Sequence, residues 1–193
     1  QHAVDEIRRR FDNDVERFAN LETGQQAAID SPLHLDLLSE AAVRTTPDAR
    51  SILDIGCGAG NYTLKLIEQL RAIGDVDAPP PRVTLLDLSG PMLERAEQRV
   101  REVGVTDVRL IWSDVRDAQL GELNFDIVVA GQCLHHLRGR AEWAYVFRRI
   151  YHSLTLGGGF WLSDSVDYEN PAVRALMRRR WGTHLESLGG PDH

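Results

Sequence analysis

"SILDIGCGAGNY", residues 51–62, is a short apolar run followed by three glycines in five positions. Glycine loses more conformational freedom on folding than any other residue, so three together indicate a tight turn or a backbone that a ligand approaches closely. Apolar residues then recur at helical spacing from Tyr62 to Ile73. The stretch predicts a strand, a glycine loop and a helix, in that order.

Four further apolar runs follow, and amphipathic helical patterns separate most of them. The runs lie at 83–88, 108–112, 125–130 and 160–164. Strands that alternate with helices predict βαβ units with right-handed crossovers. We therefore expect an α/β fold with a doubly wound, mostly parallel sheet, strand order 3-2-1-4-5 and helices on both faces. The strands read as almost continuous apolar runs, which is typical of strands covered on both sides.

The first fifty residues predict helices. One apolar stripe comprises Val4, Ile7, Phe11, Val15 and Phe18. Ser31 and Pro32 then indicate the start of another helix, because Ser is a frequent N-cap and Pro is favoured at the first helical position. Its expected apolar stripe comprises Leu33, Leu37, Leu38 and Ala41.

Acidic residues end three successive predicted strands: Asp54, Asp87 and Asp114. Ligands of open α/β sheets bind beyond the carboxyl ends of the strands. Asp87 could accept two hydrogen bonds from a ribose diol, and Asp114 one from an adenine amino group while Val115 packs on the ring. Asp54, two residues before the first glycine, favours a ligand with a positive charge over a pyrophosphate. Each acid also has a purely structural interpretation as a helix cap, a turn former or a surface charge.

A dinucleotide fits the glycine loop and its acids less well than a ligand with a positive charge, a ribose and an adenine. The dinucleotide fingerprint G-x-G-x-x-G requires glycine where this chain has Asn61. The carboxylate of Asp54 would also repel a pyrophosphate. A nicotinamide-dependent oxidoreductase is therefore an alternative that the sequence disfavours.

The composition argues against a nucleic-acid-binding, disulfide-rich or membrane-spanning protein. The net charge of -7 and a pI of about 5.5 argue against a broad electrostatic grip on nucleic acid. The two cysteines, Cys57 and Cys133, do not make a disulfide framework and are expected to be free thiols in a reducing cytoplasm. The sequence contains no apolar run of membrane-spanning length, and we expect neither a signal peptide nor a metal site.

Five segments together resemble the ordered motifs of Rossmann-like methyltransferases that use S-adenosylmethionine. They are "ILDIGCGAGNYT", "LLDLS", "SDVRD", "FDIVVAGQCLHHL" and "SLTLGGGFWLSD", within about residues 50–165. The family often has Leu-x-Pro-Gly-Gly before the fifth strand, where this chain has Leu156 and three glycines. The resemblance implies three parts: residues 1–49 as a helical cap over the active site, 50–165 as the cofactor-binding core, and 166–193 as a C-terminal helix.

The resemblance also implies which residues contact the cofactor. Asp54, Gly56 and Gly58 would contact its methionine moiety, and Asp87 both ribose hydroxyls. Asp114 and Val115 would contact the adenine. The adenosine would lie between Leu88 and Met92, and the sulfonium would border Gly131 and Gln132.

Methyl transfer depends mainly on holding the nucleophile in line with the methyl group while water is excluded. A general base is needed only when the nucleophile must lose a proton. His135 and His136, after the fourth strand, are the candidates for that base. The alternative is that the pair shapes the loop, as in relatives with different substrates. Cys133 is interpreted as a small apolar residue that fills space.

The methyl acceptor is expected to be a small molecule. One alternative is a tRNA wobble-uridine carboxymethyltransferase, which "RFDNDVER" and the C-terminal arginines faintly resemble. Another is a cofactor-binding partner protein without catalysis. A basic run such as 174–185 is most often a solvated helix face.

The end of the sequence predicts a helix over 171–186, with Val173, Leu176 and Met177 as its inner stripe. No strand-like run follows it, whereas the family continues with two more strands. The fifth strand would thus be a sheet edge, which invites pairing. We expect the natural protein to continue by roughly 40 to 60 residues, judged from ordinary strand and loop lengths. Otherwise a partner chain, as in a homodimer, or the N-terminal helices would cover this edge.

Overall fold

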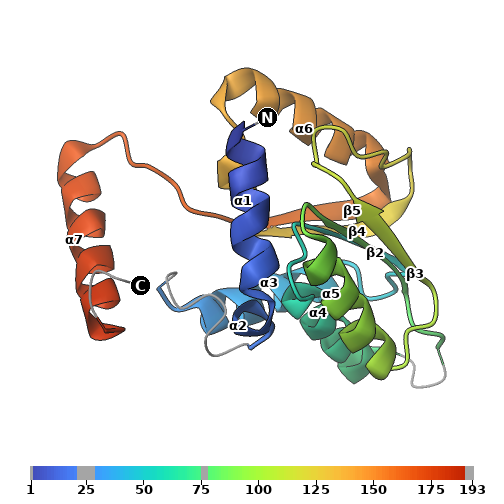
Figure 1. The fold of residues 1–193 in the computed structure, drawn as a ribbon. Coiled ribbons are helices and arrows are strands. Elements are labelled where there is room, and N and C mark those ends of the chain that lie inside the picture. The colour runs from blue at the N-terminus through green and yellow to red at the C-terminus, as the bar shows by residue number, and fades with distance from the viewer. Residues whose placement is uncertain (1, 21–28, 75–77, 190–193) are drawn as a thin grey trace.

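The computed structural model describes residues 2–20, 29–74 and 78–189 (Figure 1). Five parallel strands form one sheet in the order β3-β2-β1-β4-β5, which confirms the predicted fold class and strand order. Their bounds are β1 Ser51–Ile55, β2 Arg82–Asp87, β3 Val108–Trp112, β4 Phe125–Gly131 and β5 Leu154–Ser163. Among the described helices, none is both long and apolar enough to cross a membrane.

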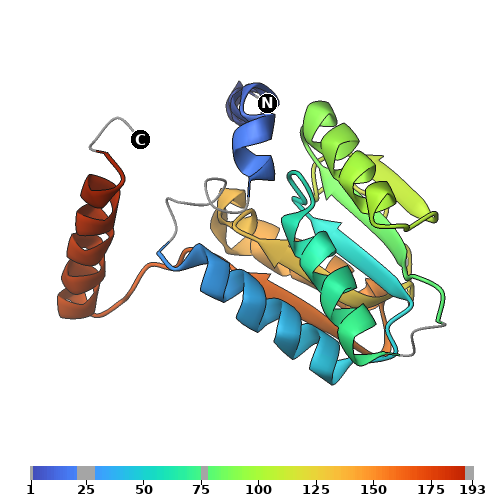
Figure 2. The same ribbon diagram turned by 90° about the horizontal axis from the view of Figure 1, so that it is seen from below.

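Helices cover both faces of the sheet (Figure 2). One face packs against α3 (Ser31–Thr45), α4 (Asn61–Ile73) and α5 (Gly90–Glu102), and the other against α6 (Gly139–Ser153). The short 3-10 helix η1 (Leu134–His136) follows β4. The strand at the centre, β1, is buried at every residue. Its apolar side chains alternate between the two faces, so that Leu53 packs toward α6 and Ile52 toward α3 and α4.

The two outer strands are only partly covered, unlike the sequence-based expectation of burial on both faces. β3 has no fully buried residue, and Trp112 at its end is 68% exposed. β5 also has no fully buried residue and lies at the opposite edge of the sheet. In the described residues no other strand pairs with the outer edge of β5. Edge strands have a neighbour on one side only, which explains why their apolar composition did not lead to full burial.

The predicted boundary of the fifth strand was wrong. β5 begins at Leu154 rather than near Phe160, because the glycines that were expected to form a turn lie inside the strand. The register with β4 shifts there: Phe125 pairs with Leu154, whereas Ile127 pairs with Gly159. The extra residues form a bulge that includes Gly157, at φ +84°.

The predicted apolar stripe of α3 was only partly right: Leu38 packs against the core and Ala41 is partly buried. Leu35, Ala42 and Val43 are buried with Ser39, whereas Leu33 and Leu37 are 52% and 56% exposed. Ser31 is the first helical residue, and Asp30 stands at the cap position. Contacts with α4 and the sheet determine which face of α3 is buried. Leu33 and Leu37 lie outside that face, and single exposed leucines are common on protein surfaces.

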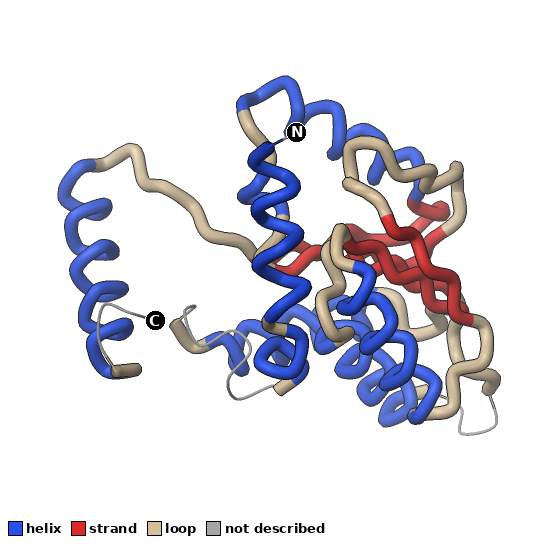
Figure 3. Tube along the Cα trace, viewed as in Figure 1, coloured by secondary structure: helices blue, strands red, loops and turns tan. Residues whose placement is uncertain are grey.

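The N-terminal helices α1 (His2–Asn13) and α2 (Val15–Ala19) lie across the carboxyl ends of the strands (Figures 1 and 3). Phe11, Val15 and Phe18 of the predicted stripe pack with Met92 and Ala59; the side chain of Val4 lies outside the described residues. Three polar contacts, here called the cap contacts, hold these helices to the core. Ser89 Oγ donates to Asp12 Oδ1 at 2.6 Å, Asn61 Nδ2 donates to the Phe18 carbonyl at 2.9 Å, and Arg95 pairs with Glu16 at 3.0 Å.

Helix α7 (Pro171–Ser187) stands apart from the sheet at the end of an extended segment (Figure 1). It has no buried residue, and Val173 and Leu176 are 38% and 41% exposed. The predicted inner stripe of this helix therefore packs against nothing in the described part of the chain. Residues 190–193, which end the predicted C-terminal segment, lie outside the described residues.

Candidate active site

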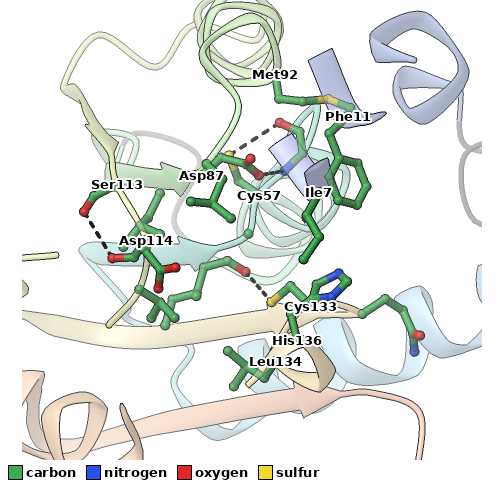
Figure 4. A pocket seen from close by; sticks show the side chains of 18 of the residues that line it. Ile7, Phe11, Cys57, Asp87, Met92, Ser113, Asp114, Cys133, Leu134 and His136 are labelled. Carbon is green, nitrogen blue, oxygen red and sulfur yellow. Dashed lines mark hydrogen bonds between the residues drawn. The ribbon is translucent and has the colours of Figure 1, made fainter. Parts of the chain in front are cut away.

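A cavity of about 400 Å³ opens at the carboxyl ends of the strands, between the sheet and the N-terminal helices (Figure 4). Its walls come from the glycine loop and from the segments that follow β2, β3 and β4. Ile7, Phe11 and Phe18 close it from the N-terminal side. The site predicted from the sequence thus lies where a doubly wound sheet places its ligands.

The glycine loop has a backbone that other residues rarely adopt. Gly56, Gly58 and Gly60 all have positive φ, at +63°, +51° and +83°. A Cβ added at Gly58 would meet open space, whereas one at Gly56 would come within 2.5 Å of Cys133 Cβ. The loop is held from below by Arg99, which donates to the Ala59 carbonyl and to Asn61. Asn61, the residue that breaks the dinucleotide fingerprint, thus holds the loop and the cap together.

Asp87 joins the glycine loop to the start of α5. Its Oδ2 accepts from the Gly58 amide at 2.8 Å, and its Oδ1 accepts from the Ser89 amide at 2.9 Å. Burial raises the pKa of this carboxyl above its ordinary value, against the backbone hydrogen bonds that lower it. Each carboxylate oxygen can accept more than one hydrogen bond, so Asp87 keeps the capacity to bind a diol in the cavity it lines.

Asp114 lines the cavity in an ion pair. Arg116 approaches both of its oxygens, at 2.9 Å from Nε and 2.6 Å from Nη2, and donates its backbone amide as well. Burial alone would raise the pKa of Asp114, but these bonds bring it below the ordinary value. The carboxylate is therefore charged and already partly occupied. Its contact with an adenine amino group stays a prediction.

Asp54 does not line the cavity. Its side chain is buried beneath the glycine loop, where Oδ2 accepts from Thr63 Oγ1 at 2.7 Å. Burial raises the pKa of Asp54 to about 7. The structure thus places this predicted ligand contact behind the loop, and a direct contact with the methionine moiety stays a prediction.

The position of Asp54 gives a testable dependence of stability on pH. The native state favours the protonated carboxyl, so the ligand-free protein should lose stability as pH rises from about 4, the unfolded value, to about 7. Asp54→Asn keeps an acceptor for Thr63 but cannot ionise. Urea unfolding at several pH values should show the wild type losing a few kcal/mol more than the variant over this window. Parallel curves would show that Asp54 is ionised in the native protein.

Two residues at the end of β4 have unusual geometry. A Cβ added at Gly131 would lie 2.0 Å from the ring of Tyr62, which is buried. Gln132 has φ +53°, a conformation that few residues other than glycine adopt. Its amide donates to the Ser163 carbonyl at 2.7 Å. Backbone strain of this kind tends to occur where structure is set by function.

The structure separates the two histidines. His135 Nδ1 lies 2.6 Å from Asp164 Oδ1, and its side chain is outside the cavity lining. His136 lines the cavity and lies edge-on to Phe11, with ring centroids 6.4 Å apart. Burial lowers the pKa of His136, and the neighbouring His135 lowers it further. A neutral imidazole therefore faces the cavity at neutral pH.

The cavity brings together most of the predicted site residues. Those that line it are Gly56, Gly58, Asp87, Leu88, Met92, Asp114, Val115, Gly131, Gln132 and His136; Asp54 and His135 do not. Their roles toward a ligand stay predictions. Ile7, Phe11 and Phe18 belong to the predicted helical cap, but the sequence did not indicate that they line the site, although their helical spacing was a signal. It also missed Tyr62 and Arg138, for which the sequence offers no local signal.

Comparison with known proteins agrees with this geometry. Residues 53–160, more than half of the chain, match the methyltransferase domain family. An uncharacterized methyltransferase of Mycobacterium tuberculosis is 30% identical over 105 residues, which are 54% of this chain and 46% of the relative. A demethylmenaquinone methyltransferase of Lactiplantibacillus plantarum is 29% identical over 128 residues, 66% of this chain and 50% of the relative. The chain spans about half the length of these relatives.

Solved structures share the fold. The 1,6-didemethyltoxoflavin-N1-methyltransferase of Burkholderia thailandensis, with bound S-adenosylhomocysteine, has a TM-score of 0.62 at 23% identity, covering 88% of this chain and 64% of its own. The N-methyltransferase NodS of Bradyrhizobium japonicum, also with S-adenosylhomocysteine, has a TM-score of 0.61 at 20% identity, covering 89% and 78%. From the family match and the shared fold together, this chain belongs to the methyltransferase domain family.

Proposed function

We propose that the protein transfers a methyl group from S-adenosylmethionine to an oxygen, nitrogen or carbon nucleophile of a small molecule. The observation that carries the proposal is the single cavity region in which a glycine loop, Asp87 and Asp114 lie at the ends of three adjacent strands. When bound, S-adenosylmethionine would supply the methyl group from its sulfonium. The methyltransferases named above that bind its demethylated product support the same reading.

The residues present fit such a ligand. The position of a Cβ on Gly58 is open space at the cavity wall, so a ligand can lie against this backbone. Asp87 offers unused acceptor capacity for a ribose diol. Met92 and Val115 offer apolar surfaces for a flat base, and both line the cavity.

The direct test is calorimetry with S-adenosylhomocysteine, followed by turnover of S-adenosylmethionine with a library of small acceptors. Binding with a dissociation constant in the micromolar range is expected. Binding without turnover across a broad library would favour the alternative of a non-catalytic partner protein. Absence of binding would refute the proposal.

We further propose that His136 is the general base where the nucleophile must lose a proton. His136→Ala should lower turnover by about 100-fold, the usual contribution of a positioned base, without changing the affinity for S-adenosylhomocysteine. His135→Ala is the matched control, because His135 lies outside the cavity lining. Equal losses in both variants, or a loss of cofactor affinity, would indicate a structural role for the pair.

The assignment of His136 as the base also predicts how turnover depends on pH. His136 must be neutral to accept a proton, and its pKa is lowered by burial, by His135 and by Arg10 and Arg138, against the opposing charge of Asp164. Turnover should therefore fall only when pH drops below the ordinary imidazole value of 6.5.

We also propose a cytoplasmic location and a homodimer in which the partner chain covers the edge of β5. The acidic net charge and the absence of a long apolar helix among the described residues favour a dissolved small acceptor over RNA or a membrane surface. Sedimentation at micromolar concentrations tests the dimer: a monomer at all concentrations would refute it.

A further inference from the structure

Two arginines on the exposed side of the cavity differ from the other arginines around it. Arg99, Arg116 and Arg149 each donate to oxygen atoms of the loops that form the cavity walls. Arg10 and Arg138 make no side-chain ion pair or hydrogen bond in the described part of the chain. A guanidinium has five donors and is always charged, so these two side chains keep their full capacity to bind an anion.

Both arginines lie beside His136. Arg138 lines the cavity two residues after His136. Arg10 lies on α1, three residues after Ile7 and one before Phe11, and both of these neighbours line the cavity. Residues three apart in a helix are neighbours on its surface, so Arg10, which is exposed and does not itself line the cavity, stands at the rim of the cavity beside Ile7. In agreement, both arginines are close enough to lower the pKa of His136.

The charges of the cavity are therefore divided between its two ends. Asp87 and Asp114 lie at the end formed by β2 and β3, while Ile7, Phe11 and His136 lie together at the other (Figure 4). Three acids near the second end, Asp12, Glu142 and Asp164, are already engaged, Asp12 by Ser89 Oγ at 2.6 Å. Glu6, one turn before Arg10 on α1, is exposed and forms no ion pair with it in the described part of the chain. Asp164 is bound by His135, and Glu142 accepts from the Arg138 amide at 2.7 Å and from Arg116 at 3.2 Å. No lining carboxylate remains there to neutralise the arginines.

We propose that Arg10 and Arg138 bind an anionic group of the methyl acceptor, which makes the substrate class a small apolar or aromatic acid. This inference rests on the proposed function. The apolar body of the acid would lie among Ile7, Phe11 and Leu137, with its nucleophile toward His136. A carboxylate suits the site best, because two guanidinium groups on different elements can each supply parallel donors to its two oxygens.

A second source of a carboxylate is the amino-acid end of the cofactor itself. The two sources predict different ligand affinities for the arginine variants. If the arginines serve the acceptor, their loss leaves the affinity for S-adenosylhomocysteine unchanged. If they serve the cofactor, their loss weakens S-adenosylhomocysteine but not 5′-methylthioadenosine, which lacks the amino-acid end.

The test compares two probes of equal shape, the anion 4-hydroxybenzoate and the neutral 4-hydroxybenzamide. Calorimetry measures the affinity of each for the chain saturated with S-adenosylhomocysteine. The acid should bind the wild type about tenfold more tightly than the amide. Arg10→Gln and Arg138→Gln should each reduce this preference, and the double variant should abolish it. Arg148→Gln, an exposed arginine of α6 outside the cavity lining, is the matched control and should keep the preference.

Equal binding of acid and amide, binding of neither, or a preference that survives in the double variant would overturn the proposal. So would selective loss of S-adenosylhomocysteine affinity in the arginine variants. If the wild type binds no S-adenosylhomocysteine, the proposed function fails instead. The two probes are then compared on the unloaded protein, where a charge preference that requires both arginines would still support an anion site.

Discussion

Gly131→Ala should destabilise the protein by about 3 kcal/mol and close part of the active site, because the added methyl group has no space. Its Cβ would lie 2.0 Å from Cε2 of Tyr62 and within 3 Å of two further ring atoms. The ring cannot move aside easily, since Tyr62 is 5% exposed and packs in the core with Ile52 and Leu66. Urea unfolding gives the change in stability, and calorimetry with S-adenosylhomocysteine gives the loss of binding.

A double-mutant cycle separates the clash from other effects of the substitution. Tyr62→Ala removes the ring, so Gly131→Ala added to that variant should change stability by less than about 1 kcal/mol. Gly182→Ala provides a second control, because its Cβ meets nothing within 4 Å and a helical glycine gains stability when replaced by alanine. An equal penalty for Gly131→Ala with and without the Tyr62 ring would show that close packing is not the reason for this glycine.

Asp87→Ala should weaken binding of S-adenosylhomocysteine by roughly 2 to 4 kcal/mol, which is about 30- to 1000-fold. Two effects combine in this loss. The variant lacks the acceptors for a ribose diol, and it leaves the Gly58 and Ser89 amides, which now donate to the carboxylate at 2.8 and 2.9 Å, without their partner. Calorimetry measures the affinity, and thermal unfolding without ligand measures how far the loop itself is loosened.

A ligand with one hydroxyl removed distinguishes the two effects. The wild type should bind the 2′-deoxy form of S-adenosylhomocysteine more weakly than S-adenosylhomocysteine itself. The Asp87→Ala variant should bind the two ligands with equal affinity. Asp114→Asn should have the smaller effect, since Arg116 already occupies both oxygens of Asp114. If the wild type and Asp87→Ala discriminate equally between the two ligands, another residue binds the ribose.

The sequence was sufficient to predict the sheet because the apolar residues that favour strands are also the residues that are buried between the helices. β1, β2 and β4 are short apolar runs bounded by turn residues, and their burial follows directly from composition. The glycine loop and the acids at the strand ends were predictable for a similar reason. Positive φ and a position at the end of a parallel strand are both properties that single residues reveal.

The sequence was insufficient where position depends on contacts between distant segments. Asp54 and Asp87 look alike as acids at strand ends, yet Thr63 holds one behind the loop while the other faces the cavity. His135 and His136 are adjacent, and only the distant Asp164 decides which of them turns away. The stripe of α7 has the spacing of a packed helix, but spacing cannot show whether a partner surface is present.

The cap contacts have a consequence for how such an enzyme can change over evolutionary time. The cap contacts and an apolar cluster help to join α1 and α2 to the core, and none of the cap contacts uses Asp87, Asp114 or Gly58. Ile7, Arg10 and Phe11 are thus encoded apart from the glycine loop and the acids at the strand ends, whereas His136, Leu137 and Arg138 belong to the same stretch as the core. Under the proposed function, substitutions in α1 and α2 can change the acceptor without altering the glycine loop, Asp87 or Asp114, provided that Asp12, Glu16 and Phe18 keep their partners.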